Sequence, residues 1–340
     1  MTDPILHGGG LRAAEARFGR PAEGWLDLST GISPWPYPVP PLGADAWRRL
    51  PEPEAVRDLE RIAAAAYGVT DPSAVVAVPG AQTAIQWLPR LRPTGRVGVL
   101  GFTYAEHAHC WRQAGHRVET VETPDGAADC DVLVVVNPNN PDGRVLSRGA
   151  VLDAAGALAA RGGVTVVDEA FADAMPETGV ADAAGRPGLC VLRSFGKMYG
   201  LAGLRLGFVL APPDLADRLR AALGPWAVGG AAIAVGTAAL ADTAWRAERT
   251  DRLAAAAGRL DRLLDRAGLR VLGGTPLFRL ADVPGGAERL HAHLARAGIL
   301  TRAFPDRSNW LRFGIPGGRR AERRLAAALD AARGTSAIAG

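Results

Sequence analysis

Short, nearly uninterrupted apolar runs recur through the middle of the chain and alternate with helical or loop segments. Such runs are typical of strands that are buried on both faces, so the pattern predicts an α/β fold with a mostly parallel, doubly wound sheet. Helices are predicted from 54 to 67, where apolar residues recur at helical spacing, and from 81 to 91. The strands of the sheet are expected at residues 75–78, 96–100, 131–136, 164–167, 190–192 and 206–210.

The two ends of the chain have different patterns. Prolines between positions 34 and 41 exclude a long helix, so residues 1–53 are predicted to form an extended arm with one short strand. Residues 54–230 then form a large domain, and residues 231–340 a bridging helix and a small C-terminal α/β domain. Within that last part, one or two long helices are expected at 231–267, strands at 270–272, 277–280 and 310–313, and helices at 286–297 and 319–333.

Composition narrows the class of protein. With 48% hydrophobic and 22% charged residues over 340 positions, the chain is globular and long enough for two domains. Its net charge of +4 is mild and its basic residues are scattered, which favours an anionic substrate over nucleic acid. Three widely spaced cysteines indicate buried thiols, with neither a disulfide framework nor a metal site. Without a signal-peptide pattern or a long apolar run, a cytoplasmic enzyme with no membrane partner is expected.

One lysine, Lys197, stands among 39 lysine and arginine residues. A lysine amine can bind an aldehyde covalently, whereas a guanidinium cannot, so this position is a candidate for amine chemistry. A lone surface lysine is the plain alternative, but glycines at 196, 200, 203 and 207 indicate a backbone that approaches a ligand closely. Polar residues also follow the ends of predicted strands, where open α/β sheets bind their ligands, at Asn137, Asp168 and Ser194.

These residues occur in an ordered series that spans most of the chain. The series resembles the fold-type I, aspartate aminotransferase-like, pyridoxal-phosphate enzymes, and it implies that Lys197 carries pyridoxal 5'-phosphate and acts as a proton donor or acceptor. Its members are Gly80-Ala-Gln82, Tyr104, Asn137-Pro-Asn-Asn-Pro141, Asp168-Glu-Ala170, Ser194-Phe-Gly-Lys197, Arg205 and Arg312.

The resemblance assigns a contact to each part of this cofactor. Asp168 pairs with the pyridine nitrogen, which keeps the ring protonated and hence an electron sink. Without the resemblance, the same residues have ordinary structural roles as a helix cap, a turn, a core ring or a surface charge. The other contacts implied are Asn137 to the ring oxygen, Tyr104 to the ring face, and Ser194, Arg205 and the backbone N–H groups of Ala81 and Gln82 to the phosphate.

Three further positions follow from the same resemblance. Tyr67 occupies the place of a tyrosine that reaches the cofactor phosphate of a partner subunit, which implies a homodimer with a composite site. Phe171 stands where the family usually has a tyrosine, so one donor to the ring oxygen is missing. Arg312 matches the arginine that holds the α-carboxylate of the substrate as a bidentate fork.

The N-terminal arm distinguishes among reactions. The sequence His7-Gly-Gly9, followed by residues 25–34, resembles the L-threonine-O-3-phosphate decarboxylases of cobalamin biosynthesis. It implies decarboxylation of L-threonine O-3-phosphate to (R)-1-amino-2-propanol O-2-phosphate; the alternative is the related histidinol-phosphate aminotransferases, and a scaffold with a dead site is disfavoured because every catalytic position is filled. The substrate is expected at His7, Gly8, Gly31, Ile32, Arg302 and Arg312, with the pairing of cations and anions left open.

Overall fold

The computed structural model describes residue 5 and residues 7–333, and it divides into two compact units. The large unit comprises residues 36–140 and 145–247; the small unit comprises residues 1–35, 141–144 and 248–340. These boundaries differ from the predicted ones at 53 and 230. The reason is visible at Gly230, where an added Cβ would stand 2.7 Å from the carbonyl oxygen of Ala46, so the second half of the arm packs on the helix that begins there.

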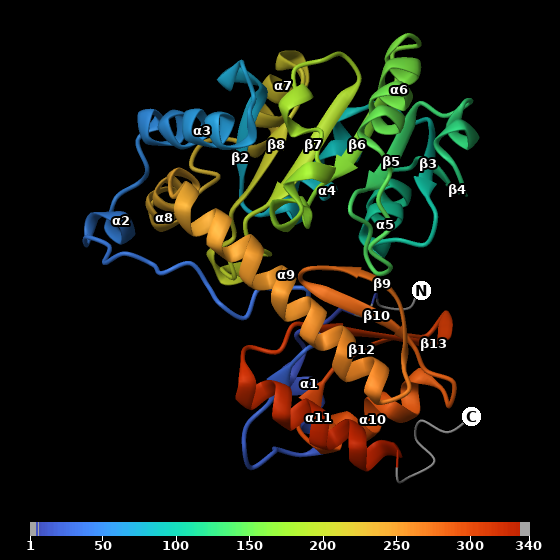
Figure 1. The fold of residues 1–340 in the computed structure, drawn as a ribbon. Coiled ribbons are helices and arrows are strands. Elements are labelled where there is room, and N and C mark those ends of the chain that lie inside the picture. The colour runs from blue at the N-terminus through green and yellow to red at the C-terminus, as the bar shows by residue number, and fades with distance from the viewer. Residues whose placement is uncertain (1–4, 6, 334–340) are drawn as a thin grey trace. The chain divides into compact units, whose positions relative to one another are not determined.

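The large unit contains a seven-stranded sheet (Figure 1). Strand β8 is antiparallel to both of its neighbours, β2 and β7, and the other pairs are parallel, which confirms the prediction of a mostly parallel α/β sheet. In spatial order the strands are β2 (Val75–Val78), β8 (Gly207–Leu210), β7 (Leu189–Ser194), β6 (Val164–Asp168), β5 (Val132–Val136), β3 (Arg96–Leu100) and β4 (Arg117–Val121).

Alternation along the strands assigns side chains to two faces of this sheet. Val132 and Val134 pack in one cluster with residues of α4 (Ala81–Trp87), α5 (Ala105–Gln113) and α7 (Pro213–Leu223). Leu133 and Val135 pack in another cluster with Leu158 of α6 (Arg148–Ala159). Each fully buried Val or Leu side chain contributes roughly 1.5–3 kcal/mol relative to exposure. The sheet is therefore a rigid support for the residues at its edge.

The remaining elements of the large unit connect or cover these layers. Helix α3 (Pro53–Tyr67) packs against α8 (Gly230–Ala241), where Gly236 lets Leu59 and Leu206 approach closely. Besides α2 (Asp45–Arg48), short 3-10 turns lie at η1 (Pro72–Ala74), η2 (Leu88–Leu91), η3 (Pro124–Ala127), η4 (Ala172–Ala174), η5 (Pro176–Thr178), η6 (Ala181–Ala183) and η7 (Ala202–Leu204).

The small unit is built on an antiparallel sheet in the order β12 (Arg302–Phe304), β13 (Arg307–Gly314), β10 (Phe278–Asp282) and β9 (Arg270–Thr275). Helix α9 (Thr243–Arg266) begins within the large unit, which ends at residue 247, and continues into the small one. Its second half shares a core with β10, β13, α10 (Ala287–Arg296) and α11 (Arg319–Arg333). The predicted arm strand is β1 (Leu26–Asp27), which pairs with β11 (Ile299–Leu300); helix α1 (Leu11–Phe18) was not predicted.

Two expectations about composition can be compared with the fold. All three cysteines, Cys110, Cys130 and Cys190, are free and buried, as predicted, and burial raises the pKa of the Cys110 thiol to about 11. Among the helices in residues 5 and 7–333, none has the length and hydropathy that a bilayer crossing requires.

Candidate active site

The strand register brings the predicted polar residues to one edge of the large sheet. Val136, the residue before Asn137, pairs with Asp168, and Asp168 pairs with Leu192 of β7. Ser194 pairs with Gly207 at the start of β8, two residues after Arg205. Gly207 also pairs with Val78, two residues before Gly80. Segments far apart in the sequence therefore meet at this edge, where ligands of open α/β sheets bind.

Asp168 is 4% exposed at the end of β6, and both of its oxygens are held by the chain. Oδ1 accepts a hydrogen bond of 2.9 Å from the backbone N–H of Ala170, and Oδ2 lies 2.8 Å from Nε2 of His107, which is 1% exposed. Sequence reasoning missed His107. Its signal is a histidine three and four residues before the apolar Cys110 and Trp111, so it lies on the buried face of α5.

The Asn137 side chain has structural partners. Its Nδ2 donates to the carbonyl oxygens of Thr178 at 3.1 Å and Leu146 at 3.4 Å, and its Oδ1 accepts from the N–H of Leu146 at 2.9 Å. With both amide hydrogens engaged and 0% exposure, the contact predicted from Asn137 to the cofactor ring oxygen is not supported. Asn139 is also 0% exposed, so Asn140, which is half-buried, is the asparagine of this motif best placed to meet a ligand.

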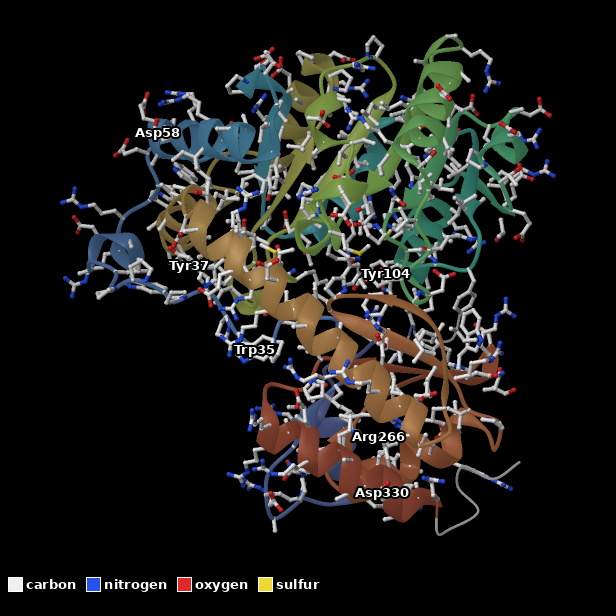
Figure 2. The ribbon with its side chains drawn as sticks, viewed as in Figure 1. Trp35, Tyr37, Asp58, Tyr104, Arg266 and Asp330 are labelled. Atoms are coloured by element: carbon white, nitrogen blue, oxygen red, sulfur yellow. The ribbon has the colours of Figure 1, made fainter. Side chains whose placement is uncertain are left out.

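Tyr104 stands at the N-terminus of α5, where Figure 2 labels it. It is half-buried, its hydroxyl donates to Oε1 of Gln82 at 3.2 Å, and its ring meets that of His107 edge to face at 6.1 Å. Burial, followed by the charges of Glu106 and Asp168, raises the pKa of the Tyr104 hydroxyl. The hydroxyl is therefore a neutral donor at ordinary pH, and the stacking of Tyr104 on a cofactor ring stays a prediction.

Arg205 lies against the turn that begins α4. An added Cβ on Gly80 would stand 2.7 Å from Nη2 of Arg205, and Gly80 has a φ of 82° that favours glycine. An added Cβ on Gly207 would stand 2.7 Å from the backbone nitrogen of Ala81. The first N–H groups of a helix have no acceptor within it. A guanidinium beside such N–H groups, with two glycines opening the space, is a cradle of the size and charge that a phosphate requires.

Lys197 follows β7 in a segment held by aromatic packing. Phe195 stacks on Tyr199 with ring centroids 4.1 Å apart, and both rings are buried. Lys197 between them is half-buried, and its Nζ lies 5.4 Å from the ring centroid of Phe171. The amine therefore lies on the same sheet edge as Asp168, against the ring of Phe171.

Tyr67 requires a correction. It is 6% exposed at the end of α3, its ring packs on Phe208, and the guanidinium of Arg193 lies 4.4 Å from its ring centroid. Its hydroxyl is buried as well, and burial, followed by the charge of Asp173, raises the pKa of this hydroxyl, while Arg193 opposes the shift. A hydroxyl enclosed by its own unit does not reach a partner subunit, so the prediction that Tyr67 binds a partner's cofactor phosphate is not supported.

The predicted substrate residues gather separately, in the small unit. Arg302 of β12 and Arg312 of β13 are direct partners in the antiparallel register. Arg312 is 7% exposed and donates to the Ser29 carbonyl oxygen at 2.8 Å. Burial, followed by the charge of Arg302, lowers the pKa of Arg312. Like charges directly opposite on two strands are unfavourable, so an anion that binds both guanidinium groups relieves this pair.

The N-terminal arm meets the same region. The N–H of Gly9 donates to Oγ of Ser29 at 2.7 Å, and a Cβ on Gly8 would collide with the Ser29 carbonyl. Of the next two residues predicted to bind substrate, Gly31 is buried and Ile32 is half-buried. A cavity of about 510 Å³ within the small unit is lined by residues that include His7, Gly8, Ser29 and Arg302.

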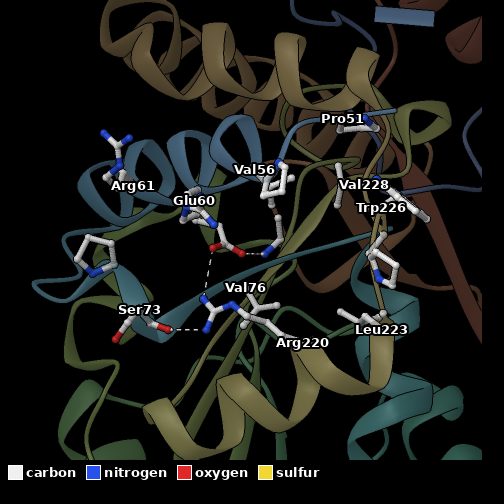
Figure 3. A pocket seen from close by; sticks show the side chains of 17 residues that line it. Pro51, Val56, Glu60, Arg61, Ser73, Val76, Arg220, Leu223, Trp226 and Val228 are labelled. Carbon is white, nitrogen blue, oxygen red and sulfur yellow. Dashed lines mark hydrogen bonds and ion pairs between the residues drawn. The ribbon is translucent and has the colours of Figure 1, made fainter. Parts of the chain in front are cut away.

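A second cavity, of about 590 Å³, lies in the large unit away from the predicted site residues (Figure 3). It is lined by α3, β2 and the segment after α7, and it includes Glu60 and Trp226. In Figure 3 the carboxylate of Glu60 points toward the guanidinium of Arg220, and Nη2 of Arg220 lies 3.3 Å from Oε2 of Glu60. None of the residues predicted to contact cofactor or substrate lines this cavity.

Similarity to known proteins agrees with this geometry. Residues 44–329 match the family described as aminotransferase class I and II. This chain belongs to that family. A threonine-phosphate decarboxylase of Pseudomonas aeruginosa is 48% identical to this chain, over 96% of this chain and 97% of the relative.

Two further proteins extend the comparison. A threonine-phosphate decarboxylase of a Sinorhizobium species is 46% identical over 97% of this chain and 98% of its own. The crystal structure of histidinol-phosphate aminotransferase from Sinorhizobium meliloti in complex with pyridoxal-5'-phosphate has a TM-score of 0.83 at 25% identity, covering 98% of this chain and 95% of that one. The fold is thus that of the aminotransferase family over nearly the whole chain.

Proposed function

We propose that this chain is a pyridoxal 5'-phosphate-dependent decarboxylase of L-threonine O-3-phosphate. The observation that carries the choice is the difference in similarity: 48% and 46% identity to threonine-phosphate decarboxylases over almost full length, against 32% to a histidinol-phosphate aminotransferase of Caulobacter vibrioides over 82% of this chain. The product would be (R)-1-amino-2-propanol O-2-phosphate, for the nucleotide-loop linker of cobalamin. Transamination of histidinol phosphate is the alternative reaction.

The residues of the large unit fit the cofactor. Lys197 would bind it covalently, Asp168 would hold the ring nitrogen, and Arg205, Ser194 and the N–H groups of Ala81 and Gln82 would hold the phosphate. The cradle beside Gly80, which a Cβ would fill, supports the phosphate assignment. When bound, pyridoxal phosphate supplies an electron sink for the carbanion that loss of carbon dioxide leaves at the α-carbon.

The chain's own residues complete the reaction. Asp168 is fixed by Ala170 and His107, and in this position its carboxylate would keep a proton on the ring nitrogen of the cofactor. Lys197, released when the amine of the substrate takes its place, would donate a proton to the α-carbon after the bond from that carbon to the carboxylate breaks. In the net reaction the substrate gains one proton, loses carbon dioxide and becomes the amine product. Lys197 recovers its proton from solvent.

Arg302 and Arg312 would bind the two anionic groups of the substrate. Their direct pairing across β12 and β13 supports this role, because one doubly anionic ligand compensates both charges. His7, Gly8, Gly31 and Ile32 would line the same region, since His7 and Gly8 share a cavity with Arg302.

A homodimer in the cytoplasm belongs to the same proposal. The most exposed large apolar side chains of the large unit, among the described residues, are Trp47 at 69%, Leu50 at 64% and Trp226 at 57%. Pro51, next to Leu50, and Trp226 line one cavity, and Ala46, next to Trp47, packs on Gly230, so these side chains belong to one region. Exposed apolar patches of this kind mark protein–protein interfaces.

The reaction is tested with purified protein loaded with pyridoxal phosphate. Adding L-threonine O-3-phosphate is expected to release carbon dioxide without any amino acceptor, with product identified by mass spectrometry. Absence of carbon dioxide, together with loss of histidinol phosphate that depends on an acceptor, would contradict the proposal.

The cofactor assignment has its own test, because Lys197 is the one lysine in the chain. Borohydride reduction of the loaded protein followed by proteolysis is expected to place the cofactor on the peptide that contains Lys197. Lys197→Ala is expected to lose both this label and the yellow colour; a coloured variant refutes the assignment.

A further inference from the structure

A fully buried arginine precedes the residues that hold the cofactor. Arg193 is 5% exposed in β7, directly before Ser194 and four positions before Lys197. Its Nη1 donates to Oε2 of Glu169 at 2.6 Å, and its Nη2 donates to Oδ1 of Asp173. Both carboxylates are buried as well. One guanidinium therefore joins two acidic side chains that come from the segment after β6.

These two acids lie in the segment that directly follows β6. Glu169 directly follows Asp168, and its N–H donates to the Leu192 carbonyl at 2.9 Å, which extends the pairing of β6 with β7 by one bond. Asp173 belongs to the turn η4. After Glu169, side-chain contacts hold the segment that follows β6 against β7: Arg193 of β7 binds Glu169 and Asp173.

Phe171 lies between the two anchored acids in the sequence. Its ring is buried, and Nζ of Lys197 lies 5.4 Å from the ring centroid. Whatever fixes Glu169 and Asp173 therefore fixes both the Asp168 carboxylate and the surface against which the Lys197 side chain rests.

Burying three charges is unfavourable unless geometry compensates. Desolvation raises the pKa of Glu169, while Arg193 and the N–H of Val180 oppose that shift. Apolar side chains of similar volume often stabilise a core as well as a buried ion pair does, so retained ion pairs suggest a need for defined geometry. The cluster lies where geometry matters most, between the strand that ends at Asp168 and the strand that leads to Lys197.

We propose that Arg193, bound by Glu169 and Asp173, is a positioning residue that sets the placement of Lys197 relative to Asp168 and Phe171. The inference rests on the proposed function only in taking Lys197 as the amine that binds the cofactor. Arg193 touches neither substrate nor cofactor in this role and acts through the two segments that it joins.

The test uses Glu169→Gln and Asp173→Asn, because removing the guanidinium itself would leave two buried carboxylates without their cation. In the apoprotein, the rate at which trinitrobenzenesulfonate modifies Lys197 is measured at one pH, with Lys197→Ala giving the background from the terminal amine. Each variant is expected to change this rate at least about threefold, the effect of half a unit in the amine pKa. In the loaded protein, the pH dependence of the visible absorbance is expected to shift too.

Glu60→Gln is the matched control. Glu60 is also a buried carboxylate of the large unit, accepts a backbone bond from Ala77 at 2.9 Å and pairs with an arginine, Arg220, but it lies outside the site. This control is expected to leave the Lys197 rate and the absorbance profile unchanged. Equal rates in all the variants would overturn the proposal.

Two further results keep the outcome decisive. If Glu169→Gln does not fold, Asp173→Asn decides, since it keeps the Arg193–Glu169 pair. Because the apoprotein rate involves neither cofactor nor substrate, it can fail while decarboxylation succeeds. Conversely, a protein that binds the cofactor at Lys197 and shows the expected rates, but releases no carbon dioxide from L-threonine O-3-phosphate, would contradict the proposed function alone.

Discussion

Nε2 of His107 lies 2.8 Å from Oδ2 of Asp168, and neither side chain is more than 5% exposed. The other carboxylate oxygen is held by the N–H of Ala170. A carboxylate with both oxygens fixed in a buried site cannot rotate, so its position relative to the strand end is defined before any ligand binds. His107 therefore fixes the orientation of the Asp168 carboxylate.

The first prediction concerns this contact. His107→Leu fills the position on the buried face of α5 with an apolar side chain and removes the hydrogen bond to Asp168. A net contribution of about 1.5 kcal/mol for a bond to a charged group corresponds to roughly tenfold lower kcat, with the cofactor still bound. His109→Leu, on the same helix and half-buried, is the control and is expected to retain activity. Equal loss in both variants would assign the effect to the helix.

The second prediction concerns the phosphate cradle. Gly80→Ala places a Cβ 2.7 Å from Nη2 of Arg205 at a φ of 82°, so the guanidinium must move and the turn is strained. We expect the dissociation constant of pyridoxal phosphate to rise about tenfold or more, the loss of one charge-assisted hydrogen bond. Equilibrium titration of the apoprotein measures it.

A matched glycine substitution controls for backbone effects. An added Cβ on Gly156, in the middle of α6, meets nothing within 4 Å. Gly156→Ala is therefore expected to raise stability by about 0.5–1 kcal/mol and to leave cofactor affinity unchanged. Weaker cofactor binding in Gly156→Ala would show that the Gly80 result is not specific to the cradle.

The sheet was predictable from sequence because a short apolar run with no polar face fits a strand buried on both sides better than it fits a surface helix or a loop. Strand β4 was missed since only Val121 of its five residues is buried, so its composition resembles that of a loop. Helix α1 was missed because one buried residue, Ala14, gives no periodic signal. Local pattern therefore reports burial well and exposed edge elements poorly.

The site shows a different limit. Glycine spacing and the single lysine predicted a site at the edge of the sheet where β6 and β7 end, and this stays a prediction. Which asparagine faces a ligand depends on partners such as Thr178, from a distant turn. Tyr67 was misplaced for the same reason, since Arg193 and Phe208, which enclose it, belong to strands β7 and β8. The spacing of His107 from Cys110 and Trp111 marks it as buried but does not reveal its contact with Asp168, and the two acidic partners of Arg193 are likewise set by tertiary structure.

The third prediction uses pH. Burial raises the pKa of Glu60 from its ordinary value of 4.5, with Ala77 and Arg220 opposing the shift. A carboxyl that ionises less readily in the folded state binds more protons there than in the unfolded state, so its contribution to stability falls as pH rises above the unfolded value. The glutamine side chain in Glu60→Gln cannot ionise. The melting temperature of this variant minus that of the wild type is expected to increase from about pH 4 to about pH 7; a decreasing difference would contradict the sign.

The fourth prediction concerns substrate anions. Arg312→Lys replaces a bidentate fork with a point charge opposite Arg302, which we expect to raise KM for L-threonine O-3-phosphate about tenfold or more, with a smaller effect on kcat. Arg270→Lys is the control, because Arg270 lies in the same sheet and pairs with Asp282 at 2.9 Å. A change in kcat alone would argue against ground-state binding of the anion by Arg312.

The last prediction concerns assembly. Trp47 and Trp226 are exposed in a region that would carry the proposed dimer contact, and burying two tryptophans supplies much of the binding energy of a typical interface. Trp47→Ser combined with Trp226→Ser is expected to convert the dimer to a monomer in light scattering coupled to gel filtration. Trp87→Ser removes a less exposed tryptophan, at 37%, and should keep the dimer. A wild-type monomer would refute the proposed dimer, and a dimeric double variant would place its contact elsewhere.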